Sequence, residues 1–174
     1  PYTGAPALAA QSALRAGADL VRVAVPAAIA DEVQGYSEDL IVRPFDGTQL
    51  TAPAVDPLLE LAADHDSVVL GPGLGDSEAT LDAVASLLAE FAGTAVVDAD
   101  ALRAIPDVKT DATLLCTPHR GEFERMGGQD AEDWERRADN VAALARDLDA
   151  TLLVKGPADV ISDGEQTRIN RTGN

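Results

Sequence analysis

Short apolar runs and longer amphipathic stretches alternate along the whole chain. Three runs are apolar or β-branched with scarcely a polar position, at residues 67–70 (SVVL), 94–97 (TAVV) and 151–154 (TLLV), and a fourth lies at 114–116 (LLC). Such runs suit strands that are buried on both faces of a sheet. We therefore expect them to form the central strands of a parallel sheet.

Between these runs, apolar residues recur with helical spacing. One helix is predicted from a cap at Asp76 or Ser77 to about Phe91, and a longer one from about residue 131 to 148. The longer helix has a predicted buried stripe that consists of Trp134, Ala138, Val141, Ala145 and Leu148. Strands that alternate with helices in this way indicate parallel pairing, with helices packed against the sheet.

The two ends of the chain complete this pattern. A helix is predicted at 5–16, stopped by Gly17, and strands at 19–25 and 39–44. Residues 160–169 are predicted to form an antiparallel pair around a Ser-Asp-Gly turn. The whole pattern predicts a single α/β domain over residues 1–174. Its sheet is expected to be mostly parallel, with helices on both faces and a small antiparallel hairpin near the C-terminal end.

Four of the predicted strands run directly into unusual residues. These segments are GPGLG at 71–75, DAD at 98–100, TPHRGE at 117–122 and KG at 155–156. The carboxyl ends of parallel strands lie at one edge of the sheet, and ligands bind at that edge in open α/β folds. The convergence of four such segments predicts a ligand site there.

Each segment also has a plainer interpretation. A glycine-rich turn lets backbone approach a ligand, but just as often it is only a tight turn. Asp98 could hold a metal or a ligand, whereas Asp100 is better explained as the cap of a short helix at 101–104. A lone histidine such as His119 usually has a structural hydrogen bond, and Glu122 could cap the helix that follows it.

Lys155 has a stronger case for function than the other single residues. It is one of only two lysines in the chain, and it stands at a strand end beside a glycine, where an ammonium group can meet phosphate. The alternative is an ordinary surface lysine. The single cysteine, Cys116, is best explained as a small buried residue.

The charge of the chain excludes some classes of partner and indicates the environment in which the protein works. Thirty acidic residues face thirteen basic ones, for a net charge of −17, and this surface would repel nucleic acid and anionic membranes. Scattered acids with almost no lysine are typical of proteins from a salt-rich cytoplasm, so we expect a cytoplasmic, halophilic protein. One cysteine allows no internal disulfide and no CxxC metal site.

Seven segments in one order make the chain resemble the family of ADP/ATP-dependent NAD(P)H-hydrate dehydratases, a carbohydrate-kinase-like branch of the ribokinase superfamily. The segments are YTGAP at 2–6, ALRAGA at 13–18, GPGLG at 71–75, DADAL at 98–102, TPHRGEF at 117–123, LVKG at 153–156 and NRTGN at 170–174. Each segment alone is weak, but together they span the chain. The resemblance implies a ribokinase-like fold.

The resemblance also implies a site. Hydrated NAD(P)H would be bound by Ala5, Gly73 and His119, and the phosphates of ADP or ATP would lie along Lys155, Gly156, Pro157, Ala158 and Asp159. An acid such as Asp159 is unusual there, because the family often has a hydroxyl residue and an acid repels phosphate unless a cation intervenes. Mg²⁺ would accompany the nucleotide, and no residue of this chain is assigned as a ligand of that ion. The resemblance favours ADP over ATP as the nucleotide.

The family pattern further includes a GGTGD segment, whose aspartate is the expected catalytic base. That motif does not occur in this sequence, so the base is expected beyond Asn174, and no catalytic residue is assigned within residues 1–174. The chain would be incomplete at its C-terminus, cut near Pro1, and inactive alone. Family members associate with, or are fused to, an NAD(P)H-hydrate epimerase, and many are homo-oligomers, often tetramers.

Two other functions are compatible with the sequence. A ribokinase-type kinase of a vitamin alcohol, such as hydroxyethylthiazole or pyridoxal, would share the sheet and the glycine turns. A non-catalytic nucleotide-binding fragment would share everything except turnover.

Overall fold

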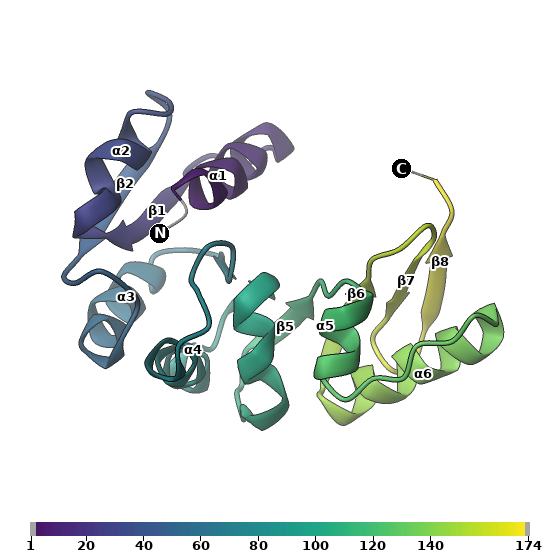
Figure 1. Ribbon diagram of the computed structural model, residues 1–174. Coiled ribbons are helices and arrows are strands. Elements are labelled where there is room, and N and C mark those ends of the chain that lie inside the picture. Colours follow the sequence, from purple (N-terminus) through teal and green to yellow (C-terminus); the bar gives the residue numbers. More distant parts are fainter. Residues whose placement is uncertain (1–2, 173–174) are drawn as a thin grey trace.

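The computed structural model describes residues 3–172, so Tyr2, Gly173 and Asn174 of the matched segments lie outside the described residues. Its elements (Figure 1) are α1 (Gly4–Ala16), β1 (Arg22–Pro26), η1 (Ala27–Ile29), α2 (Ala30–Gln34), β2 (Ile41–Phe45), η2 (Ala52–Ala54), α3 (Val55–Ala62), β3 (Ser67–Leu70), α4 (Glu78–Glu90), β4 (Thr94–Val97), η3 (Ala99–Asp107), β5 (Thr113–Cys116), α5 (Arg120–Arg125), α6 (Trp134–Asp147), β6 (Ala150–Val154), β7 (Asp159–Ser162) and β8 (Thr167–Asn170). The η elements are 3₁₀ helices.

The strands form two sheets. The larger has the order β3-β4-β5-β6-β7-β8, in which β3 to β6 are parallel and β7 and β8 add an antiparallel hairpin. The α/β fold with a mostly parallel sheet and a C-terminal antiparallel pair is therefore confirmed. The smaller sheet pairs β1 with β2 in parallel and packs with α1 and α2 around its own apolar cluster. We call β1, β2, α1 and α2 the small unit.

Helices cover one face of the larger sheet. Because β3, β4, β5 and β6 follow one another in space as in sequence, right-handed crossovers place all of their connecting helices on the same side, which Figure 1 shows as a row of helices from α3 to α6. The covered face is buried at Ala95, Val97, Leu114, Cys116, Leu152 and Val154. The strand order does not reverse within this sheet, so the helices that connect its parallel strands share one face among residues 3–172.

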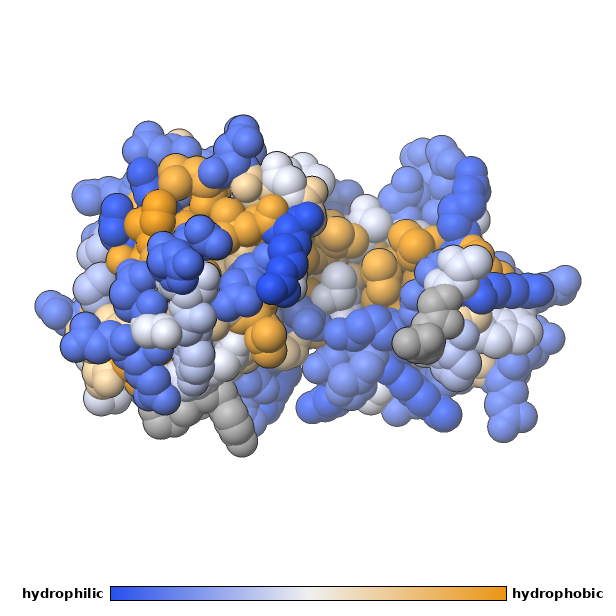
Figure 2. Space-filling view, turned by 90° about the horizontal axis from the view of Figure 1, so that it is seen from above, coloured by the Kyte–Doolittle hydropathy of each residue, from blue (hydrophilic) through white to orange (hydrophobic). Residues whose placement is uncertain are grey.

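The opposite face carries apolar residues that remain partly open. Val69, Val96 and Leu115 pair across β3, β4 and β5, and Val69 is 51% exposed. Seen from above, apolar residues gather mainly on the side of the small unit and continue, more sparsely, past the middle of the molecule (Figure 2). No helix within residues 3–172 combines the length and the apolar character that a bilayer crossing demands.

Local signals behave largely as expected. Gly17 ends α1 with φ 105°, and the Ser77 side chain caps α4 by accepting a hydrogen bond from the Thr80 N–H. The stripe predicted on α6 is wrong at its start, because Trp134 is 37% exposed and Arg137 is buried instead. Arg137 tolerates burial because it finds an acid, Asp130, and because its long aliphatic stem packs like an apolar side chain.

Candidate functional site

The four segments singled out in the sequence lie together where β3, β4, β5 and β6 end, and we call this place the carboxyl edge. Backbone hydrogen bonds join each segment to the next strand. The N–H of Asp98 donates to Leu70 O at 3.0 Å, that of Thr117 to Val97 O at 3.0 Å, and that of Lys155 to Pro118 O at 2.8 Å. The predicted convergence of these segments is therefore present in the fold.

The GPGLG segment needs its glycines. Gly71 has φ 124°, and a Cβ placed on it would lie 1.7 Å from the carbonyl oxygen of Asp98, so only glycine allows this close packing. Gly73, at φ 82°, is exposed at the edge. The N–H of Gly75 donates to Asp100 Oδ2 at 3.1 Å. The interpretation of Asp100 as a helix cap is wrong, because η3 starts at Ala99 and the carboxylate of Asp100 binds the glycine loop instead.

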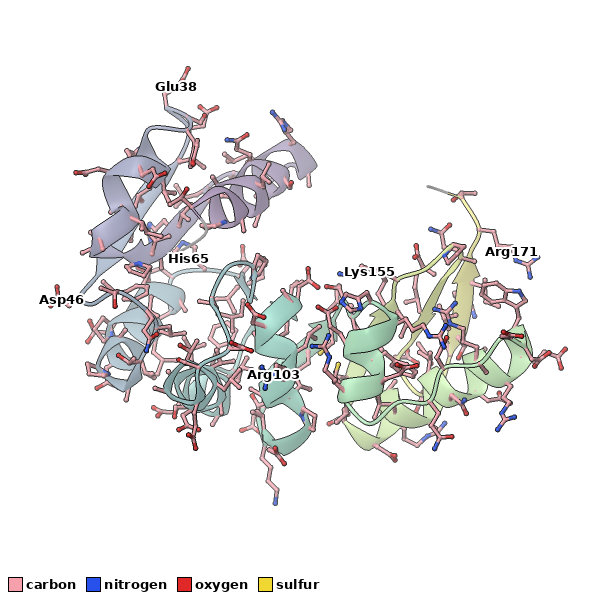
Figure 3. The ribbon with its side chains drawn as sticks, viewed as in Figure 1. Glu38, Asp46, His65, Arg103, Lys155 and Arg171 are labelled. Atoms are coloured by element: carbon pink, nitrogen blue, oxygen red, sulfur yellow. The ribbon has the colours of Figure 1, made fainter. Side chains whose placement is uncertain are left out.

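Asp98 and Lys155 form an ion pair across the carboxyl edge. Lys155 Nζ lies 2.8 Å from Asp98 Oδ1, and the two side chains are 42% and 31% exposed. Burial raises the pKa of Asp98, but hydrogen bonds from Lys155 and from the Ala99 N–H, with the lysine charge, outweigh burial and hold this pKa below its ordinary value of 3.8. In Figure 3, Lys155 lies where the larger sheet ends, beside α5. The Lys155 ammonium is therefore held by a carboxylate while its side chain stays partly exposed.

His119 and Glu122 cap α5 reciprocally. Nδ1 of His119 accepts hydrogen bonds from the N–H groups of Gly121 and Glu122 at 3.0 and 3.3 Å, and Glu122 Oε2 accepts one from the His119 N–H at 2.8 Å. The structural interpretations of both residues are thus confirmed. Because Nδ1 is an acceptor, the ring proton of neutral His119 sits on Nε2, and the ring is 55% exposed. Nε2 lies 3.4 Å from Glu122 Oε1, so a ligand that accepts a hydrogen bond from Nε2 would compete with that carboxylate.

Asp159, the acid that is unusual for the family, is hydrogen-bonded to the turn that follows Lys155. Asp159 Oδ1 accepts a hydrogen bond from the Gly156 N–H at 3.1 Å, and its Oδ2 accepts one from Asn170 Nδ2 at 3.3 Å. Both carboxylate oxygens of Asp159 are thus used inside the turn and its link to β8. This explains how an acid can occupy the predicted nucleotide segment.

Two residues near this turn were missed by the sequence reasoning. Arg137, in the first turn of α6, places its guanidinium 3.1 Å from the position that a Cβ on Gly156 would occupy. Asp130 pairs with Arg137 Nε at 3.0 Å, and both side chains are less than a tenth exposed. The available signal was an arginine that interrupts the apolar period of the helix. Arg137 therefore packs against the predicted nucleotide segment at Gly156.

Two further residues that the sequence singled out are Ala5 and Cys116. Ala5 is in the first turn of α1, whose main packing partners are β1 and α2, so the structure assigns it to the small unit. Cys116 is fully buried, as expected, and burial raises the pKa of its thiol to about 12. Among residues 3–172, no three His, Cys, Asp or Glu side chains are placed to hold a metal ion.

Known proteins match the chain over its whole length. The family model described as NAD(P)H-hydrate dehydratase matches residues 1–174. The bifunctional NAD(P)H-hydrate repair enzyme Nnr of Pyrobaculum aerophilum is 40% identical over 99% of the chain, which spans 35% of that protein. The ADP-dependent (S)-NAD(P)H-hydrate dehydratase of Cenarchaeum symbiosum is 38% identical, and the chain spans 61% of it. The chain therefore corresponds to about a third of the bifunctional relatives.

Solved structures agree with this assignment. The ADP/ATP-dependent NAD(P)H-hydrate dehydratase of Bacillus subtilis, co-crystallized with ATP/Mg²⁺, has a TM-score of 0.77 at 26% identity over 99% of this chain and 60% of that one. A hydroxyethylthiazole kinase of Pyrococcus horikoshii has a TM-score of 0.54 at 16% identity, covering 97% of this chain and 67% of the kinase, and it shows the shared fold alone. The chain belongs to the NAD(P)H-hydrate dehydratase family, with a ribokinase-like fold.

Proposed function

We propose that this chain contributes the carboxyl-edge site of an ADP-dependent dehydratase that converts the S epimer of hydrated NAD(P)H back to NAD(P)H. The observation that carries the proposal is the Asp98–Lys155 pair, since it links the DAD segment to the predicted phosphate segment across the end of β5. Relatives named for this reaction match the whole chain, which supports the same assignment.

The reaction repairs a nicotinamide ring that has gained water across a double bond. The β-phosphoryl group of ADP passes to the ring hydroxyl, which gives AMP and a phosphate ester. The C–O bond then breaks, a proton leaves the neighbouring carbon, and the double bond returns as phosphate departs. Phosphate leaves far more readily than hydroxide, so the nucleotide supplies the driving force for dehydration.

The residues of this chain bind and orient the two nucleotides. His119 donates from Nε2 to the hydrated nicotinamide nucleotide and does not act as the base, because its Nδ1 lone pair is used by the N–H groups of Gly121 and Glu122. Gly73 offers exposed backbone to the same ligand. Ala5 would join these residues from the small unit, and the phosphates of ADP would lie along residues 155–159.

The described residues suit a magnesium ion only if that ion is brought by the nucleotide. Asp98 is engaged by Lys155 and Asp100 by the Gly75 N–H, so no ready set of carboxylates exists at the carboxyl edge. Mg²⁺ commonly keeps several waters and binds through phosphates with one or two carboxylates. Bound in this way, it would neutralise charge on the phosphoryl group in transfer.

The proposal assigns part of the reaction to groups outside this chain. The family's GGTGD segment, absent from this sequence, would supply the aspartate base, so the 174 residues alone would bind nucleotides weakly and not turn over. An NAD(P)H-hydrate epimerase, fused in relatives named as bifunctional, would supply the reactive epimer. Assembly as a homo-oligomer, such as a tetramer, also belongs to this proposal.

A chimaera tests the proposal directly. Residues 1–174 would replace the matching segment of the Pyrobaculum aerophilum repair enzyme, with which they share 40% identity. We expect the chimaera to restore the absorbance of reduced nicotinamide from chemically hydrated NADH when ADP is present and not when ADP is omitted. The isolated chain should show no turnover.

The same chimaera distinguishes the proposed dehydratase from the main alternative function, a vitamin-alcohol kinase. A folded chimaera that leaves hydrated NADH unchanged but phosphorylates hydroxyethylthiazole or pyridoxal would overturn the proposal in favour of a vitamin-alcohol kinase. Calorimetry on the isolated chain should find only weak binding of ADP. Tight binding would contradict the expected sharing of the phosphate site with the GGTGD segment.

A further inference from the structure

Asp98 and Lys155 are brought together from strands that are not neighbours. Asp98 follows β4 and Lys155 follows β6, with β5 between them. Neighbouring strands lie about 4.8 Å apart, so the two backbones are separated by roughly 10 Å. The Lys155 side chain spans this gap over the end of β5, where its own backbone is held by Pro118 O.

The backbone around Asp98 is fixed from several sides. Its N–H donates to Leu70 O at 3.0 Å, and the absence of a side chain at Gly71 lets the carbonyl of Asp98 approach closely. Ala99, the next residue, has φ 52°, in the left-handed region that an L-residue other than glycine seldom adopts. Unfavourable backbone of this kind concentrates where a side chain must be held in one place.

Stability does not account for this arrangement. The side chains of Lys155 and Asp98 are 42% and 31% exposed, and ion pairs with this much solvent contact contribute little to folding. A lysine side chain that is free at one end samples many rotamers. The fixed carboxylate therefore does more for the direction of the ammonium group than for the fold.

We propose that Asp98 is a positioning residue, which holds the Lys155 ammonium across the end of β5, between the predicted sites of the hydrated nicotinamide nucleotide and of the phosphates. This inference rests on the proposed function. An ammonium group has three N–H donors, and Asp98 takes one of them. The other two remain for oxygens of the phosphoryl group as it passes from one nucleotide to the other.

The composition of the chain makes this inference measurable. Lys155 and Lys109 are the only lysines, so ¹³C-labelled lysine yields two ε-methylene signals in the 174-residue chain. Lys109 is exposed and serves as the internal reference. Lys155→Met assigns the signals, Asp98→Asn removes the charge at constant shape, and Asp98→Glu retains it. Asp107→Asn, an exposed change at the far end of η3, is the matched control.

We expect the Lys155 signal to be resolved from that of Lys109 in the native chain and in the Asp107→Asn variant. It should move toward the Lys109 position in Asp98→Asn and to an intermediate position in Asp98→Glu. Titration with millimolar ADP should shift Lys155 and not Lys109. The apparent affinity for ADP should fall about fivefold in Asp98→Asn, as expected for the loss of one oriented hydrogen bond.

Two results would overturn the inference. An Asp98→Asn chain with an unmoved Lys155 signal would show that the carboxylate does not position the ammonium. Tighter ADP binding by Asp98→Asn would show that Asp98 only competes with phosphate. If native Lys155 is resolved, moves in Asp98→Asn, and never responds to ADP, the positioning holds and the proposed nucleotide site fails, so the two claims are separable. Circular dichroism of each variant confirms that the chain is folded.

Discussion

Glu122 and His119 each accept a hydrogen bond from the other's backbone N–H, at 2.8 Å to the Glu122 carboxylate and 3.3 Å to His119 Nδ1. The structural role and the proposed ligand role of the histidine therefore use different ring nitrogens. Nδ1 caps the start of α5, whereas the proposed donor to the ligand is Nε2, which also lies 3.4 Å from Glu122 Oε1. Substitutions that separate the two nitrogens can test each role by itself.

His119→Ala should lower the free energy of unfolding by about 1 kcal/mol, because α5 loses its cap. His119→Asn should cost much less, since asparagine caps helices well, yet it lacks the Nε2 donor. Urea unfolding of the isolated chain measures the first effect. In the chimaera, both variants should raise KM for hydrated NADH to a similar extent. Equal loss of stability in the two variants would contradict the capping role.

Gly71→Ala and Gly75→Ala compare two glycines of one loop. Both have positive φ, at 124° and 79°, but a Cβ at Gly71 meets Asp98 O at 1.7 Å, whereas one at Gly75 meets nothing within 4 Å. Backbone strain alone costs about 1 kcal/mol at Gly75, and the clash should add roughly 2 kcal/mol at Gly71. Thermal or urea unfolding measures the difference. Similar losses at both positions would argue against the close packing of Gly71 on Asp98.

The exposed face of the larger sheet predicts a contrast between two strand residues. Leu152 is fully buried, so Leu152→Ala should destabilise the chain by about 3 kcal/mol. Val69 is 51% exposed on the opposite face, so Val69→Thr should change stability by less than about 0.5 kcal/mol. Urea unfolding of both variants measures the two changes in the free energy of unfolding. A large loss from Val69→Thr would mean that this face is covered when the isolated chain is in solution.

The net charge of −17 predicts a strong response to salt. Raising KCl from about 0.1 M to about 1 M shortens the Debye length from about 10 Å to about 3 Å and so screens the repulsion among the acids. The urea midpoint should rise with KCl. Sucrose at equal osmolality strengthens burial without screening charge and is the control. A midpoint that responds equally to both, or falls in KCl, would remove the case for adaptation to a salt-rich cytoplasm.

The central strands were predictable because local and global signals agree there. The predicted strands at 67–70 and 94–97 coincide with β3 and β4, since apolar β-branched runs stop at glycine or aspartate. The position of the carboxyl edge was also predictable, because the carboxyl ends of parallel strands lie at the same edge of a sheet. The Gly17 stop and the Ser77 cap depend on their own neighbours and were equally accessible.

Features that depend on contacts between distant residues were not accessible in this way. Asp100 binds Gly75, and Arg137 is buried by Asp130 and Gly156, each through long-range packing that a local pattern does not encode. The one-sided packing of helices depends on strand order, which the sequence leaves open. The 3₁₀ segment η3 extends to Asp107, beyond the short helix expected at 101–104.

The most direct test of the account is the set of amide signals that ADP perturbs in the ¹⁵N-labelled 174-residue chain. The account predicts that the largest changes fall on Lys155, Gly156, Ala158 and Asp159, with smaller ones at 71–75 and 117–122 along the same carboxyl edge. Perturbations gathered instead on the small unit, or scattered without preference for that edge, would contradict it.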